Sequence, residues 1–238
     1  MGRASRPARI LQNPLLLLLI AASAPAYTPE QFRSSGKTVH VDRYRPGGSA
    51  PAPLVILLHG GAGPTAHHFP YRKLAVALAN RGMAVEIPHY LDAAKPDRAG
   101  SGEPYGIWIS ALRDEIDAYR QRSGIAAGKT ALVGFSLGAS LALAAAADGL
   151  PISAVAECAG SLPDRYVASL RSLPPILIVH NRGDTVMPFA NAEQLLRLCD
   201  MRHYPCEARL GAGTVHGLPS PESESIDRIV RFISAHVL

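Results

Sequence analysis

The chain has 238 residues, of which 24 are Lys or Arg and 19 are Asp or Glu, so its formal net charge is +5 at pH 7. This length suits one α/β domain with a substantial core, and no internal repeat is visible. Residues 27–238 hold 21 basic and 19 acidic residues, a net charge of only +2, without a basic cluster. The sequence therefore gives no indication of a nucleic-acid partner.

The first 26 residues resemble a secretory signal. Arg3, Arg6 and Arg9 precede an apolar run at residues 14–22, and Ala24-Pro25-Ala26 offers an Ala-x-Ala cleavage site. The alternative is an uncleaved anchor, but a membrane span needs about 20 apolar residues. We therefore expect a signal peptide at residues 1–26, a mature domain at residues 27–238 in a secreted or periplasmic location, and no stable membrane insertion after cleavage.

Apolar runs and helical periodicities alternate along the mature chain. Such alternation predicts a mostly parallel, doubly wound sheet with helices on both faces, whose chemistry lies at the carboxyl ends of the strands. The strand at 39–45 alternates apolar and polar residues, which predicts an antiparallel edge strand. Further strands are expected before Gly134 and at 54–58, 83–87, 152–156, 175–179 and 206–210, and helices at 71–80, 107–122, 137–148, 189–198 and from about 223 onward.

Two segments near the amino-terminal strands could contribute to a site. His59-Gly60-Gly61 follows the strand at 54–58, and glycines let backbone amides approach a substrate, so the Gly61 amide is a candidate oxyanion donor. A simple strand-to-helix turn is the alternative. The long polar stretch at 88–106 carries Tyr90 and Tyr105, which are candidate substrate-binding residues unless the loop is merely solvated.

The segment Gly134-Phe135-Ser136-Leu137-Gly138 joins an apolar run to an alanine-rich helix, as a nucleophile elbow does. The two glycines remove Cβ atoms that would collide in so sharp a turn. Ser136 is the candidate nucleophile. The Leu137 amide, at the start of the helix, is the second candidate oxyanion donor.

A serine hydroxyl needs a histidine base, and that imidazole needs a carboxylate partner. Asp184 and His216 follow Ser136 in the chain order that α/β-hydrolases use, each just after a predicted strand. Glu157 and Asp164 are the alternative acids. No metal or other cofactor is expected, since the adjacent His67 and His68 would chelate one ion poorly.

From about residue 37 onward the chain resembles the α/β-hydrolase superfamily, and within it the dienelactone hydrolase-like branch. The resemblance rests on the elbow, on residues 180–188 around Asp184, and on residues 214–218 around His216. Dienelactone hydrolases proper use a cysteine nucleophile and carry a glutamate-bearing motif at the position of His59-Gly60-Gly61. The sequence therefore looks more like a serine esterase on a related frame.

The resemblance implies a single-domain α/β-hydrolase fold and a carboxylesterase that acts on small soluble esters through an acyl-enzyme. A small peptidase or amidase, and a non-catalytic binding protein of the same fold, are the alternatives. The connection at 158–174 has room for one short helix, so no large cap is expected.

Three cysteines are present, Cys158, Cys199 and Cys206. Cys199 and Cys206 are seven positions apart across a predicted helix-to-strand turn, and an exported chain meets an oxidising compartment. We therefore expect these two to form a disulfide and Cys158 to remain free, the alternative being three reduced thiols.

Overall fold

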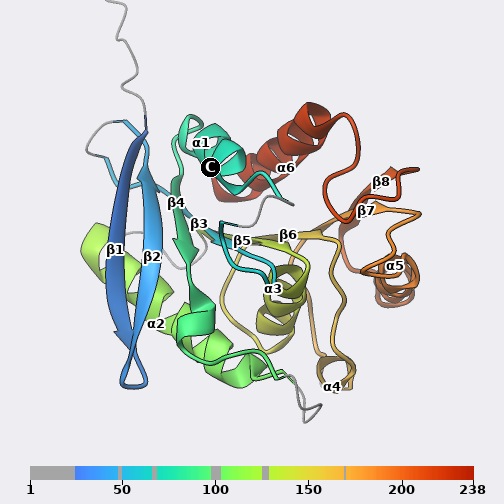
Figure 1. The fold of residues 1–238 in the computed structure, drawn as a ribbon, viewed down its shortest axis with the longest axis horizontal. Helices are drawn as coiled ribbons and strands as arrows, with labels where there is room; N and C mark the ends of the chain where they lie inside the picture. The colour runs from blue at the N-terminus through green and yellow to red at the C-terminus, as the bar shows by residue number, and fades with distance from the viewer. Residues whose placement is uncertain (1–24, 48–49, 66–68, 98–102, 125–128, 169) are drawn as a thin grey trace, which may run out of the picture.

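The computed structural model describes residues 25–47, 50–65, 69–97, 103–124, 129–168 and 170–238. These residues build a sheet of eight strands in the order β1-β2-β4-β3-β5-β6-β7-β8, in which β3 to β8 run parallel and β1 and β2 run antiparallel to their neighbours (Figure 1). The strands are β1 Ala26–Ser34, β2 Lys37–Arg45, β3 Leu54–Leu58, β4 Ala84–Pro88, β5 Thr130–Phe135, β6 Ala154–Cys158, β7 Ile176–Asn181 and β8 Cys206–Gly211.

Helices cover both faces of the sheet (Figure 1). They are α1 Tyr71–Ala79, α2 Tyr105–Ser123, α3 Leu137–Ala147, α4 Asp164–Val167, α5 Ala190–Arg202 and α6 Glu222–Val237, and a 3-10 turn, η1, spans Tyr90–Asp92. β3 is buried along its whole length, with alternate side chains entering opposite layers. Leu54, Ile56 and Leu58 belong to the core cluster that includes side chains of α2, α3 and α5, whereas Val55 and Leu57 belong to the cluster with α1 and α6. The predicted doubly wound α/β fold is therefore confirmed.

The prediction of an edge strand at 39–45 is wrong in its position. β2 covers this segment, but β1 pairs along its outer side in a register that runs from Ala26 opposite Arg45 to Ser34 opposite Lys37. The hairpin turn is Ser35-Gly36, and both residues have positive φ, 46° and 80°. A two-residue turn of this kind matches the twist of an antiparallel pair. β1 escapes a search for alternating apolar residues because most of its side chains are exposed.

The connection between β6 and β7 is short, as predicted. In its described part, which omits residue 169, the only helix is α4, of four residues. The expectation that no large cap covers the carboxyl ends of the strands is therefore confirmed for these residues. Among the helices that the structure describes, none is long and apolar enough to cross a membrane.

A disulfide joins Cys199, near the end of α5, to Cys206, the first residue of β8, and Cys158 is free and buried. The expected pairing is confirmed. The Cα atoms of the bridge are 6.1 Å apart. At their opposite ends, the same two elements adjoin the loops that carry Asp184 and His216.

We expect the double substitution Cys199→Ala, Cys206→Ala to lower the free energy of unfolding by about 2–3 kcal/mol, because the bridge restricts the unfolded chain across a short loop. Urea denaturation of the oxidised wild type and the double variant measures this difference. Cys158→Ala is the control for loss of a thiol in the core. Equal stability of the oxidised wild type and the double variant would contradict the expectation.

Candidate active site

Ser136 lies in the turn between β5 and α3 with backbone angles φ 54° and ψ −120°, a strained conformation for a residue with a side chain. The flanking glycines make this turn possible. A Cβ on Gly134 would lie 2.3 Å from the Gly138 carbonyl oxygen, and one on Gly138 would lie 2.3 Å from the carbonyl oxygen of Leu58. The sharp turn thus packs directly against β3, as a nucleophile elbow requires.

The Ser136 hydroxyl begins a continuous chain of hydrogen bonds. His216 Nε2 lies 2.9 Å from Ser136 Oγ, and His216 Nδ1 lies 2.8 Å from Asp184 Oδ2. Because an ionised carboxylate only accepts hydrogen bonds, Nδ1 carries the proton and Nε2 offers a lone pair to the serine. Such an arrangement can take a proton from the hydroxyl and return it to a leaving group.

Asp184 is buried and accepts hydrogen bonds on both oxygens. Its Oδ1 accepts from the backbone amides of Val186 and Met187, each at 2.9 Å. Burial disfavours the charged carboxylate, but the hydrogen bonds from His216 and the two amides outweigh it and hold the pKa of Asp184 below its usual range. The carboxylate is therefore ionised at neutral pH and keeps the His216 ring in one tautomer.

The His59–Gly61 segment lies against the elbow. The Cβ position of Gly60 is 3.4 Å from Ser136 Cβ, and that of Gly61 is 3.6 Å from the Leu137 side chain. The Gly61 backbone thus lies against the Leu137 side chain at the mouth of the turn. As the first residue of α3, Leu137 has an amide without an acceptor inside the helix.

His59 and two tyrosines hold this segment in place. His59 Nδ1 donates to the Gly60 carbonyl at 2.8 Å, and burial lowers the pKa of His59 to about 4, so the ring is neutral. Tyr90 stacks on this ring and its hydroxyl donates to the His59 carbonyl at 2.7 Å, while the Gly60 amide donates to the Tyr71 hydroxyl at 2.9 Å.

Tyr90 and Tyr105, the candidate substrate-binding residues, are both buried. Tyr90 has no exposed surface, because it packs beneath the His59 carbonyl. Tyr105 is buried against Trp108 and Tyr166, and burial raises its pKa to about 12. Both side chains belong to the supporting core. β4 ends at Pro88 and the short η1 helix begins at Tyr90, so Tyr90 belongs to a helical turn instead of an open loop.

Asn181 is a positioning residue that the sequence did not single out. Its side-chain amide donates to the carbonyls of Val215, at 2.9 Å, and Gly217, at 3.3 Å, on either side of His216. A Cβ on Gly211 would lie 2.3 Å from Asn181 Oδ1, so the His216 loop passes close to this side chain. The only sequence signal for this positioning role was the place of Asn181 at the end of β7, three residues before Asp184.

The alternative acids do not reach His216. Asp164 is exposed at the start of α4. Glu157 is fully buried, accepts a hydrogen bond from the Gly160 amide at 2.9 Å, and has an Oε1 atom without a partner. Burial raises the pKa of Glu157 from its ordinary 4.5 to about 7.

This raised pKa predicts a specific dependence of stability on pH. The unfolded chain ionises Glu157 above pH 4.5, whereas the folded chain keeps it protonated until about pH 7, so unfolding becomes easier as pH rises through this window. The shift corresponds to about 3 kcal/mol. Measured by urea denaturation at pH 4, 6 and 8, Glu157→Gln is expected to gain about that much relative to wild type as pH rises. A difference that stays constant with pH would refute this role of Glu157.

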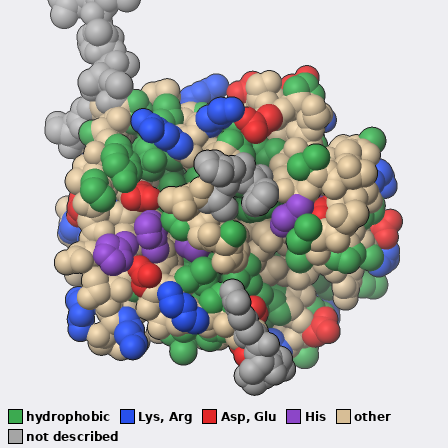
Figure 2. All heavy atoms as spheres, viewed as in Figure 1, with side chains coloured by type: hydrophobic (Ala, Val, Ile, Leu, Met, Phe, Trp, Pro, Cys, Tyr) green, Lys and Arg blue, Asp and Glu red, His purple; other side chains and the backbone are tan. Residues whose placement is uncertain are grey.

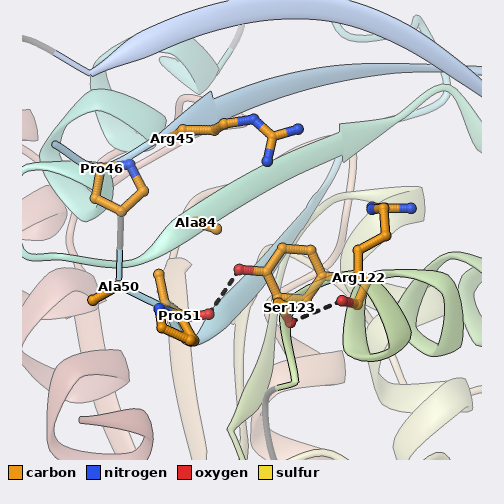
Figure 3. Close-up of a pocket in the computed structure, with 9 residues that line it drawn as sticks. Arg45, Pro46, Ala50, Pro51, Ala84, Arg122 and Ser123 are labelled. Atoms are coloured by element: carbon orange, nitrogen blue, oxygen red, sulfur yellow. Dashed lines mark hydrogen bonds between the residues drawn. The ribbon is translucent and has the colours of Figure 1, made fainter. Parts of the chain in front are cut away.

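A cavity of about 470 Å³ lies at the amino ends of β3 and β4, beside Ala52, Ala84 and Tyr119 (Figure 3). Arg45 and Arg122 lie along its rim, and both are already paired, with Glu30 and Glu115 respectively. None of the described residues that line the cavity belongs to the hydrogen-bonded chain at Ser136. Among the residues that the structure describes, no group of three or more His, Cys, Asp or Glu side chains could hold a metal ion.

Known proteins give a consistent match to this fold. The model of the alpha/beta hydrolase family matches residues 55–232. No curated protein sequence matches the chain. Among solved structures, a dienelactone hydrolase-like promiscuous phosphotriesterase from metagenomic libraries superposes with a TM-score of 0.72 at 17% identity, over 90% of this chain and 99% of its own.

Two esterase structures are similar to a comparable extent. The esterase Est22 has a TM-score of 0.69 at 18% identity, over 89% of this chain and 81% of its own. A fungal esterase from Rhizomucor miehei has a TM-score of 0.70 at 18% identity, over 91% of this chain and 85% of its own. At such identities the likeness concerns the fold, and the family follows from the model match over most of the domain. The chain belongs to the alpha/beta hydrolase family.

Proposed function

We propose that the chain is a serine carboxylesterase in which Ser136 is the nucleophile, His216 the general base and Asp184 the acid that orients it. The observation that carries the proposal is the pair of hydrogen bonds from Ser136 Oγ to His216 Nε2 and from His216 Nδ1 to Asp184 Oδ2. The esterase structures that share the fold support the same reaction class.

The reaction follows from the positions of these atoms. His216 Nε2 takes the proton of Ser136 as its oxygen attacks the ester carbonyl, and the amides of Leu137 and Gly61 stabilise the oxyanion. The imidazolium, held by Asp184, then protonates the departing alcohol. Water activated by His216 attacks the acyl-enzyme and releases the acid.

A fluorophosphonate probe tests the nucleophile directly, because only an activated serine reacts with it. We expect rapid labelling of the mature chain, with the added mass on the peptide that holds Ser136. Heat-denatured protein is the control. Hydrolysis of esters faster than of matched anilides would favour an esterase over a peptidase or amidase, and absence of labelling would favour a non-catalytic binding protein.

The short β6–β7 connection predicts a preference for short acyl chains. With only α4 in the described part of this connection, little protein surface can bury a long chain, and each unburied methylene forgoes about 0.8 kcal/mol. Across a series of nitrophenyl esters we expect kcat/KM to be highest for acetyl to butyryl groups. Rates that rise steadily to palmitoyl, with activation at a lipid interface, would contradict this.

We further propose that the chain is exported. The arginine-led apolar segment and the Ala-x-Ala sequence support this, although residues 1–24 lie outside the described part of the chain. The disulfide between Cys199 and Cys206 supports it independently, because such bonds persist in oxidising compartments. The intact mass of protein recovered from the medium or periplasm should correspond to a chain that begins at Tyr27.

A further inference from the structure

Two loops meet at the Asp184 carboxylate, and each exposes a valine beside the candidate triad. Asp184 Oδ1 accepts from the Val186 amide at 2.9 Å, while Oδ2 binds the ring of His216, which follows Val215 in the chain. Val186 is 61% exposed and Val215 is 67% exposed. On the face in Figure 2, hydrophobic side chains are scattered over most of the surface, and some of them lie on the side that carries β7 and β8.

Hydrogen bonds join the two loops close to the valines. The Gly183 amide donates to the Gly213 carbonyl at 3.0 Å, and Asn181 Nδ2 donates to the Val215 carbonyl at 2.9 Å. A Cβ on Gly183 would lie 2.8 Å from the Thr214 side chain. Exposed valines on two loops that hydrogen bonds tie to each other offer apolar area that a ligand can contact without ordering the protein first.

Neither of the two loops exposes an acidic side chain. Across residues 181–187 and 211–217 the charged side chains are Asp184, which is buried in its hydrogen bonds, and Arg182, whose guanidinium lies over the Phe189 ring at 4.8 Å. A cationic group placed on the valines would lose water without gaining an anionic partner. An apolar group would gain contact area there.

The chemistry of the triad indicates which part of a substrate lies here. His216 must protonate the departing oxygen, so the alcohol part of the ester leaves from the side of the His216 loop, away from the amides of Gly61 and Leu137. We propose that Val186 and Val215 are specificity-determining residues that bind an uncharged, apolar leaving alcohol of aromatic or branched type. This inference rests on the proposed esterase function.

Benzyl and methyl acetates test the proposal, because the two alcohols have similar acidity and both esters form the same acetyl-enzyme. We expect kcat/KM to favour benzyl acetate by about tenfold. The double substitution Val186→Thr, Val215→Thr keeps the β-branched shape and adds hydroxyls, and should lower the benzyl-to-methyl ratio about fivefold. Ile107→Thr is the matched control, since Ile107 is also exposed but lies beside Ser34 and Lys37 of the β1–β2 hairpin.

A second pair of substrates tests the absence of cation recognition. Acetylcholine and its uncharged isostere dimethylbutyl acetate have the same shape, and we expect the isostere to have the higher kcat/KM. A preference for acetylcholine, or a benzyl-to-methyl ratio that the double variant leaves unchanged, would overturn the proposal while ester hydrolysis stands. If no ester is hydrolysed and the fluorophosphonate does not label Ser136, the esterase assignment itself fails, and this inference with it.

Discussion

Replacing Ser136 by alanine is expected to lower kcat for a short-chain ester by about 10⁴- to 10⁶-fold, because members of such a triad act as a unit. The hydroxyl is the atom that would form the acyl bond, and His216 Nε2 lies 2.9 Å from it. Alanine fits the same backbone, so the turn and its packing against Gly134 and Gly138 should persist. Stopped-flow or spectrophotometric assays of purified protein measure the loss.

The control for this substitution is Ser172→Ala, which removes a hydroxyl from an exposed position remote from the elbow. Both variants should show the circular dichroism spectrum and unfolding midpoint of wild type. Ser136→Ala should also lose fluorophosphonate labelling. Retention of wild-type activity in folded Ser136→Ala protein would remove Ser136 from the mechanism.

The substitution Asp184→Asn should lower kcat by about 10⁴-fold, the magnitude known for the equivalent change in a serine protease. The asparagine amide can donate to His216 Nδ1, which would move the ring proton to Nε2 and leave no lone pair for Ser136. Two backbone amides also bind Asp184 Oδ1, so the variant tests the orienting carboxylate while its oxygen contacts can remain.

Asp164→Asn is the matched control, since Asp164 was an alternative acid and is exposed at the start of α4. Its activity should equal that of wild type. If Asp164→Asn were inactive and Asp184→Asn active, the orienting acid would have to be reassigned, and the hydrogen bond from His216 to Asp184 would be a structural contact only.

The fold was readable from the sequence because its signals are local. Continuous apolar runs such as 54–58 mark strands covered on both faces, and helical periodicity marks the segments between them. The elbow was readable because its Gly-x-Ser-x-Gly pattern is local, although the atoms that a Cβ on Gly138 would meet belong to Leu58 and His59. The order of Ser136, Asp184 and His216 followed from the positions of strand ends in a parallel sheet.

Contacts between segments that are far apart in the chain could not be predicted from local sequence patterns. Tyr90 was expected in an open loop, but it lies in η1 and donates to the His59 carbonyl, 31 positions earlier in the chain. Arg43 resembles a surface residue in sequence, yet it is 4% exposed, with Glu86 at 3.0 Å and Glu115 at 2.5 Å. Such a cluster depends on β2, β4 and α2 meeting, which no local pattern encodes.

The sequence by itself determined the α/β architecture, the sharp turn at Ser136 and the candidate residues at the strand ends, because neighbouring residues impose sterics and periodicity on the backbone directly. Only the tertiary structure decided which side chains meet. It joined Ser136 to His216 across 80 positions, removed Tyr90 and Tyr105 from the surface, and brought the Val186 amide and the His216 ring to the same carboxylate. These outcomes depend on how separate loops pack at the edge of the sheet, where small changes in strand register and loop length redirect a side chain.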